Sequence, residues 1–364
     1  MIPYLGVFVF SLICLYLTEK SYNKILKRFL FLVAILMPAA LAGLRDPLIG
    51  TDTSGYPLYT YDFVSRASSL YQAITWNDSV EGAYSFIGYV SSHILNVFNF
   101  FLFVVSLITM IGVLWGGVAS KEDKVWLFFL FFFMYYNTSL NAQRQAMALA
   151  MCLPCIAYTS RKKYVLAALA FVLAYCLHHS AILFASAIAL YYFIERMPKT
   201  FNKTITKLLL IIAIVGILAS FNAILTSLVG FGLEDKYVER YGSSDEYGSN
   251  VPISLFALNL FNFIVYKFIT RKSTKDTLYI FGDYTMIIGV LLCFAGLIST
   301  FAVRIDAYFM FINILILTHY LPKATMFWKA STVGFYIFYW LMVVVVANLG
   351  DTYPYTSIIL GQFI

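Results

Sequence analysis

Long apolar runs recur along almost the whole chain, and they constrain its fold more than any other feature. The 364 residues are 61% hydrophobic and only 12% charged. A soluble domain of this length could not bury so much apolar surface, whereas a bilayer accepts it in runs of roughly 17–25 residues per crossing. Because the backbone in lipid must satisfy its own hydrogen bonds, each run is predicted to be helical. We therefore expect an all-α polytopic integral membrane protein.

The runs predict about twelve transmembrane helices, within one transmembrane domain that covers residues 1–364. The expected spans are residues 4–17, 29–44, 99–118, 125–139, 145–159, 164–177, 180–194, 208–229, 252–269, 279–300, 304–321 and 330–347. Two long loops interrupt this pattern, at residues 45–98 and 230–252. The end of the first loop is moderately apolar, so it is predicted to form a helix on the membrane interface.

Basic residues predict the orientation of these helices. Most of the 25 Lys and Arg residues fall in alternate loops, which should therefore face the cytoplasm. The six basic residues expected on the opposite face are Arg45, Arg66, Arg144, Lys236, Arg240 and Arg304. Both long loops are then extracytoplasmic. The net charge of +7 reflects this topology and an attraction to anionic membrane lipid, and it is no sign of nucleic-acid binding.

Charged side chains near a bilayer are costly to keep, so those on the outer face are candidates for function. The first group is Asn141, Arg144 and Gln145, at the outer junction of two predicted spans. Arginine binds phosphate through two parallel hydrogen bonds, and the flanking amides add further polar contacts. The alternative is an arginine that extends to the lipid headgroups.

A second group lies at the start of the first long loop. It contains Arg45 and Asp46, followed by Asp52 and Tyr56. Gly50 suggests a tight turn that returns Asp52 toward the membrane, where Asp52 or Asp46 could act as a base. The alternative is a surface ion pair between Arg45 and Asp46.

A third group is the pair His178 and His179, in an outer turn between two very apolar segments. Histidine exchanges a proton most easily near neutral pH, so either residue could serve in acid–base chemistry. A pair that only hydrogen-bonds the loop backbone is equally open. Two adjacent histidines without a further ligand at suitable spacing are poor evidence for zinc.

The last candidates come from the second half of the chain. Arg304, Asp306 and Tyr308 open a predicted outer helix end and could form a second phosphate anchor. Arg240 lies in the Tyr-rich loop 230–252, which is either a solvated loop or a lid that offers stacking faces to sugars. We expect these groups to converge with the earlier ones in a single extracytoplasmic pocket.

These motifs resemble the EpsG-like, Wzy-type polysaccharide polymerases. The resemblance rests first on the run Gly43-Leu44-Arg45-Asp46-x-x-x-Gly50-Thr51-Asp52-Thr53-x-x-Tyr56 and on Asn141-x-x-Arg144-Gln145. The segment 169–183, with His179-Ser180, matches the next family landmark, and Arg304-x-x-x-Tyr308 and Pro354-Tyr355 fit more loosely. His178 beside His179 departs from the pattern, and His179 is preferred as the family position because a serine follows it.

The resemblance implies a GT-C-like glycosyltransferase of the bacterial cytoplasmic membrane whose active site faces outward. Such enzymes move a glycan from one undecaprenyl pyrophosphate onto another lipid-linked repeat unit, without a metal or other cofactor. A chain-length-regulating co-polymerase is an expected partner. On this basis Asp52, Asp46 and His179 are the candidate bases. Arg144 and Arg304 are the candidate pyrophosphate ligands, and Arg45 is an orienting or pairing residue at the substrate.

Three other functions remain open at this point. A flippase for lipid-linked oligosaccharides would need charges near the middle of the membrane, and the predicted spans hold almost none. An O-antigen ligase would share the outward phosphate site and differ only in its acceptor. A membrane acyltransferase is the third alternative.

Overall fold

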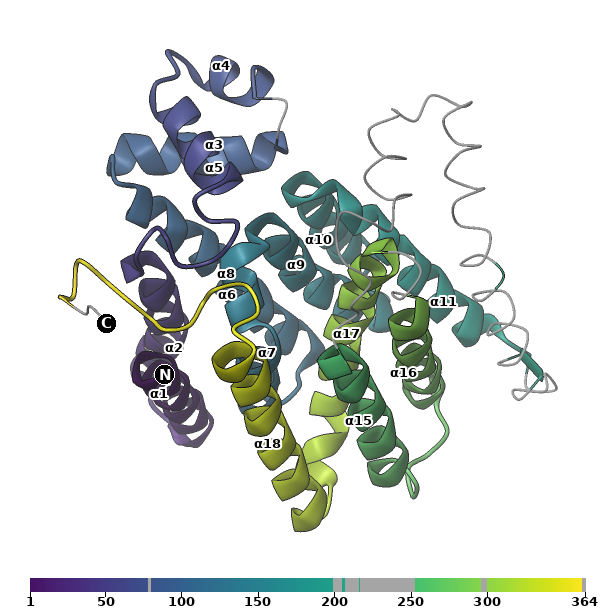
Figure 1. Cartoon of the computed structure of the whole chain (residues 1–364). Helices are drawn as coiled ribbons and strands as arrows, with labels where there is room; N and C mark the ends of the chain where they lie inside the picture. Colours follow the sequence, from purple (N-terminus) through teal and green to yellow (C-terminus); the bar gives the residue numbers. More distant parts are fainter. Residues whose placement is uncertain (78–79, 199–204, 207–215, 217–252, 296–299, 362–364) are drawn as a thin grey trace. The chain divides into compact units, whose positions relative to one another are not determined.

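The computed structural model describes residues 1–77, 80–198, 205–206, 216, 253–295 and 300–361, and it divides the chain into two compact units (Figure 1). The first unit comprises Met1–Ile182 and Lys329–Ile364, and the second comprises Leu183–Trp328. The described residues are predominantly helical, as the apolar runs predict.

In the described residues, ten helices run from the start of the first unit to the turn that holds the two histidines. They are α1 (Ile2–Lys20), α2 (Lys24–Leu44), α3 (Tyr56–Ser65), α4 (Leu70–Thr75), α5 (Gly82–Ile94), α6 (Phe98–Ser120), α7 (Lys124–Met134), α8 (Tyr136–Asn141), α9 (Gln143–Ser160) and α10 (Tyr164–Leu177). Helix α6 packs along α9 and α2, and α9 also packs along α10. Helix α9 is therefore covered by neighbours on several sides.

The contact between α6 and α9 depends on two glycines one turn apart. A Cβ added at Gly112 would lie 2.8 Å from the Cβ of Ala150, and one at Gly116 would lie 2.5 Å from the Cβ of Leu153. Small residues at this spacing let two helix backbones approach closely, which is a common basis of helix pairing in membranes. The close approach holds α9 in a fixed position.

The two ends of α9 meet different sets of residues. At its carboxyl end, Arg161 donates a hydrogen bond from Nη1 to the carbonyl of Ala119 at the end of α6 (2.7 Å). Arg144 lies at the opposite end, about 26 Å away at 1.5 Å of rise per residue. The basic turns expected in the cytoplasm and the candidate Arg144 thus lie at opposite ends of one buried helix.

The first long loop folds into three short helices, α3 to α5, around a small core. Val64 and Ala73 are fully buried there, and Tyr89 packs against them. Ser69 begins α4 by accepting a hydrogen bond at Oγ from the backbone N–H of Gln72 (3.2 Å). The helix predicted within residues 82–98 is present as α5, while its location on the membrane interface stays a prediction.

The C-terminal segment returns to the helix ends near the candidate site. Helix α18 (Met326–Trp340) continues as a π-helical turn (Leu341–Val346), and the segment after it passes beside α8, as the yellow trace in Figure 1 shows. The hydroxyl of Tyr4 donates to the carbonyl of Thr352 (2.6 Å), and that of Tyr355 donates to the carbonyl of Leu41 (2.9 Å). The start of α1 and the end of α2 therefore lie at the same end of the first unit.

The second unit contains α11 (Ala185–Arg196), α15 (Ile253–Ile269), α16 (Thr277–Ala295) and α17 (Thr300–Tyr320). Helix α16 packs against α15, α17 and α11. At one end of this unit Lys267 pairs with Asp283, a buried acid.

Six helices in the described part of the chain are long and apolar enough to cross a membrane: α1, α2, α6, α16, α17 with the short turn that follows it, and α18 with its π-helical turn. Helices α7, α10 and α15 are apolar but shorter, and the predicted span 208–229 lies outside the described residues. The predicted span 180–194 begins with a 3-10 turn, His179–Phe184, before α11. The protein is thus a multi-helix membrane protein, and the number of twelve spans stays a prediction.

Candidate functional site

The carboxylate of Glu81 joins two candidate groups that lie far apart in the sequence. Its Oε2 accepts a hydrogen bond from Nη1 of Arg144 at 2.7 Å. Its Oε1 lies 2.5 Å from Nδ1 of His178 and accepts a hydrogen bond from the backbone N–H of His179 at 3.2 Å. One buried side chain thereby connects the start of α9 with the turn that follows α10.

The electrostatics of this cluster favour an ionised glutamate. Burial alone would raise the pKa of Glu81, since the side chain is only 6% exposed. The hydrogen bond from His178 and the positive charge of Arg144 outweigh that effect and lower the pKa to about 2. Glu81 is therefore a carboxylate at any physiological pH, and it acts only as a hydrogen-bond acceptor.

The ring of Tyr56 packs against the guanidinium of Arg144. The guanidinium carbon lies 4.4 Å from the centre of the Tyr56 ring, a distance typical of cation–π contact. The Tyr56 hydroxyl accepts from the backbone N–H of Gln143 and donates to the carbonyl of Asn141, both at 3.1 Å. Because the first N–H groups of a helix have no partner within it, this hydroxyl also stabilises the start of α9.

Arg45 lies behind this cluster. Its side chain is only 2% exposed, and Nη2 donates to the carbonyl of Leu140 (2.8 Å) and to Oγ1 of Thr53 (3.2 Å). Among the described residues Arg45 forms no ion pair, so the alternative of a surface pair with Asp46 does not apply to it. Arg45 therefore anchors the start of the first long loop to Leu140 in α8.

The two aspartates of this loop lie nearer its surface. Asp46 is partly buried and accepts a hydrogen bond at Oδ1 from the backbone N–H of Leu48 (3.1 Å). Asp52 is exposed. Burial raises the pKa of Tyr56, and the charge of Asp52 raises it further. The roles of both as bases stay predictions.

Asn141 connects this loop with the C-terminal segment. Its Nδ2 donates to the carbonyl of Gly350 at 2.6 Å. On its other side lies Gly50, where an added Cβ would come within 2.3 Å of Oδ1 of Asn141. Gln145 is half-buried and forms no hydrogen bond through its side chain within the described residues.

The structure distinguishes the two histidines that the sequence could not separate. His178 is held by Glu81, and its side chain is 19% exposed. His179 is exposed, and its ring centre lies 5.0 Å from that of Tyr175. Of the two imidazoles, only that of His178 contacts Glu81.

The later candidates belong to the second unit. Asp306 and Tyr308 are buried, and Oδ2 of Asp306 accepts a hydrogen bond from Nδ2 of Asn259 at 2.9 Å. Arg304 is half-buried. Arg240 lies outside the described residues, and the convergence of all these groups in one pocket stays a prediction.

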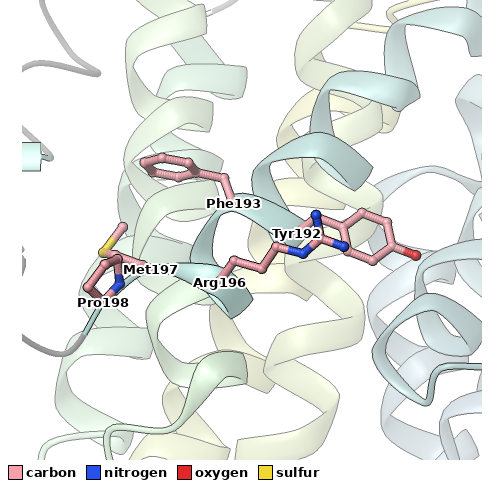
Figure 2. A pocket seen from close by; sticks show the side chains of 5 residues that line it. All are labelled: Tyr192, Phe193, Arg196, Met197 and Pro198. Atoms are coloured by element: carbon pink, nitrogen blue, oxygen red, sulfur yellow. The ribbon is translucent and has the colours of Figure 1, made fainter.

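A small hollow in the second unit is lined by Tyr192, Phe193, Arg196, Met197 and Pro198 (Figure 2). The guanidinium carbon of Arg196 lies 5.9 Å from the centre of the Tyr192 ring. The hollow lies at the carboxyl end of α11, where the distribution of basic residues predicts the cytoplasmic face. It contains none of the candidate groups.

Glu81 is the residue that sequence reasoning missed. It occupies the position before the first residue of α5, yet its side chain does not cap that helix and turns to Arg144 and His178 instead. The sequence offered only a weak signal for Glu81: a single acid directly before the apolar helix predicted at the end of the first long loop.

The fold and the site together define a multi-helix membrane protein with a charged cluster where several helix ends meet. The chain belongs to the EpsG family, whose family model matches residues 28–357 and which is the Wzy-like polymerase family. Comparisons with the curated proteins and with the solved structures give no significant match. Membership of the family indicates a function of the polysaccharide polymerase type.

Proposed function

We propose that the chain is a Wzy-type glycosyltransferase that joins oligosaccharide repeat units carried on undecaprenyl pyrophosphate, at the outer face of the bacterial cytoplasmic membrane. The observation that carries the proposal is the set of contacts that hold the Arg144 guanidinium. Its guanidinium is held by a hydrogen bond from Nη1 to Glu81 and by the ring of Tyr56, and the side chain is 20% exposed. A guanidinium has five N–H donors, so others remain for an anionic ligand.

The reaction suits such a guanidinium. A hydroxyl oxygen of the acceptor sugar attacks the anomeric carbon of the donor glycan, and the bond from that carbon to the pyrophosphate oxygen breaks. The electron pair leaves with undecaprenyl pyrophosphate, whose negative charge grows as the bond breaks. A preorganised arginine in a site of low dielectric stabilises that growing charge, because it pays no reorganisation at the moment of reaction.

The remaining candidates keep the roles that the sequence suggests for them. We place Arg304 and Arg240 as further contacts for the diphosphate or the sugars, with Asp306 and Tyr308 beside the first of them. Guanidinium groups supply the positive charge that a metal ion would otherwise contribute, so we infer a metal-independent transfer. A chain-length-regulating co-polymerase would act on the same growing polymer.

A purified reaction tests this function. The protein in detergent is mixed with a synthetic lipid-pyrophosphate repeat unit, without a nucleotide sugar, and the product is separated on a gel. We expect a ladder of polymer, with or without EDTA. Unchanged substrate combined with translocation of the lipid in liposomes would contradict the polymerase and favour a flippase. Transfer of a single block onto a different lipid acceptor would indicate a ligase.

A further inference from the structure

We propose that His178, held by Glu81, accepts the proton of the attacking sugar hydroxyl at Nε2, and that Glu81 is the positioning residue for this base. The inference rests on the proposed function, since it assigns the proton transfer within the same reaction. It differs from the expectation drawn from sequence, in which His179 or an aspartate is the base.

The tautomer of His178 follows from its partner. Because Glu81 is ionised and can only accept hydrogen bonds, the proton between the two groups belongs to Nδ1 of His178, 2.5 Å from Oε1. In the neutral imidazole the other nitrogen, Nε2, then carries a lone pair. Within the described residues Nε2 has no hydrogen-bond partner, and the side chain is 19% exposed. A basic nitrogen is thus directed away from Glu81 and can reach a ligand.

The carboxylate of Glu81 also holds the imidazole of His178 near Arg144, the residue proposed to bind the pyrophosphate. Glu81 binds Arg144 through Oε2 and His178 through Oε1, so one planar group sets the spacing between guanidinium and imidazole. The backbone N–H of His179 also binds Oε1, which fixes the turn at the end of α10. A base and an anion ligand held by one side chain match the two demands of the transfer: proton removal from the hydroxyl and stabilisation of the leaving pyrophosphate.

In the proposed step one C–O bond forms, one C–O bond breaks and one proton moves to His178. The hydroxyl oxygen forms its bond to the anomeric carbon while its proton passes to Nε2, and the pyrophosphate leaves with the electron pair. His178 becomes an imidazolium next to the Glu81 carboxylate, which stabilises the new charge at short range. The imidazolium returns its proton to water after the product leaves.

Three variants test the assignment in the ladder assay. His178→Gln is expected to lower kcat by at least about 100-fold, which is the lower end of the range for general-base catalysis. Binding of the lipid-pyrophosphate donor, measured separately by equilibrium binding, should stay within about threefold, because Arg144 is retained. His179→Gln is the direct rival, and His93→Gln is a matched control on α5, where His93 is exposed and stacks on Tyr89.

Glu81→Gln supplies a readout that a structural role would not move. The other titratable groups of this cluster are Arg144, on α9, and the hydroxyls of Tyr56 and Tyr84. Gln can offer an N–H to Nδ1, which would move the imidazole proton to Nε2 and remove the lone pair there, so kcat should fall. Glu81→Asp keeps a carboxylate that only accepts hydrogen bonds and should recover part of kcat.

The outcomes separate this proposal from the function on which it rests. If the wild-type protein makes no ladder, the proposed function fails. A wild-type ladder with full activity in His178→Gln, or with the large loss in His179→Gln instead, overturns the proposal alone. A Glu81→Gln protein that melts earlier but keeps the wild-type kcat assigns Glu81 to folding only. If Glu81→Gln does not fold, His178→Gln with retained donor binding still decides the identity of the base.

Discussion

The amide nitrogen of Asn141 donates a hydrogen bond to the carbonyl of Gly350 at 2.6 Å, although 209 residues separate the two. The contact closes the C-terminal segment over the helix ends that hold the candidate site. It also makes the backbone at Gly350 intolerant of a side chain, because its φ is +84° and an added Cβ would lie 2.2 Å from Nδ2 of Asn141.

Gly350→Ala is therefore expected to destabilise the protein by roughly 1–3 kcal/mol, through strain at the left-handed backbone and through the clash with Asn141. Thermal unfolding in detergent measures the effect. Gly334→Ala is the matched control, because a Cβ at Gly334, inside α18, meets nothing within 4 Å. That control should be neutral or slightly stabilising. Equal midpoints for the two variants would show that the Asn141 contact does not constrain Gly350.

Arg144→Lys tests the phosphate role of the guanidinium. Lysine keeps the positive charge and loses the planar fork, so we expect polymer yield to fall about tenfold or more while the folded protein is retained. Arg66→Lys is the control: Arg66 lies in the first long loop, and its side chain is 81% exposed. The ladder assay at matched protein concentration checks both variants. Unchanged chain length and yield in Arg144→Lys would remove Arg144 from the proposed site.

The lowered pKa of Glu81 predicts that the folded protein loses stability in acid. The folded pKa of about 2 lies below the ordinary value of 4.5, so the carboxylate stabilises the fold fully above about pH 4.5. This contribution, on the order of a few kcal/mol, should be lost as the pH falls from 4.5 toward 2. Melting curves of wild type and Glu81→Gln across that range measure it, and the difference between them should shrink as the pH falls. A constant difference would contradict the depressed pKa.

Arg45→Ala should act on the fold rather than on substrate affinity. The change leaves the buried carbonyl of Leu140 without one donor and opens a cavity, at a cost of roughly 2–4 kcal/mol. Thermal unfolding and the yield of monodisperse protein check the prediction, with Arg66→Ala as the exposed control. A stable Arg45→Ala protein with a raised KM would instead support the substrate-orienting role that the sequence suggested for Arg45.

The sequence alone determined the class of protein and much of its helical layout. Apolar runs predict helices because lipid offers the backbone no partners, and α1, α2, α6, α9 and α10 correspond to predicted spans. The same local logic placed Arg144 at the start of a helix and the two histidines in a turn.

Only the tertiary structure decided which of these groups meet. The cluster of Glu81, Arg144 and His178 joins residues 63 and 97 positions apart, and no local pattern encodes such contacts. Burial also determined the structural role of single residues. Arg45 is a buried residue that holds its loop, and the imidazole of His178, unlike that of His179, contacts Glu81. Both findings depend on packing between helices that are distant in sequence, because this packing sets hydrogen-bond partners and exposure.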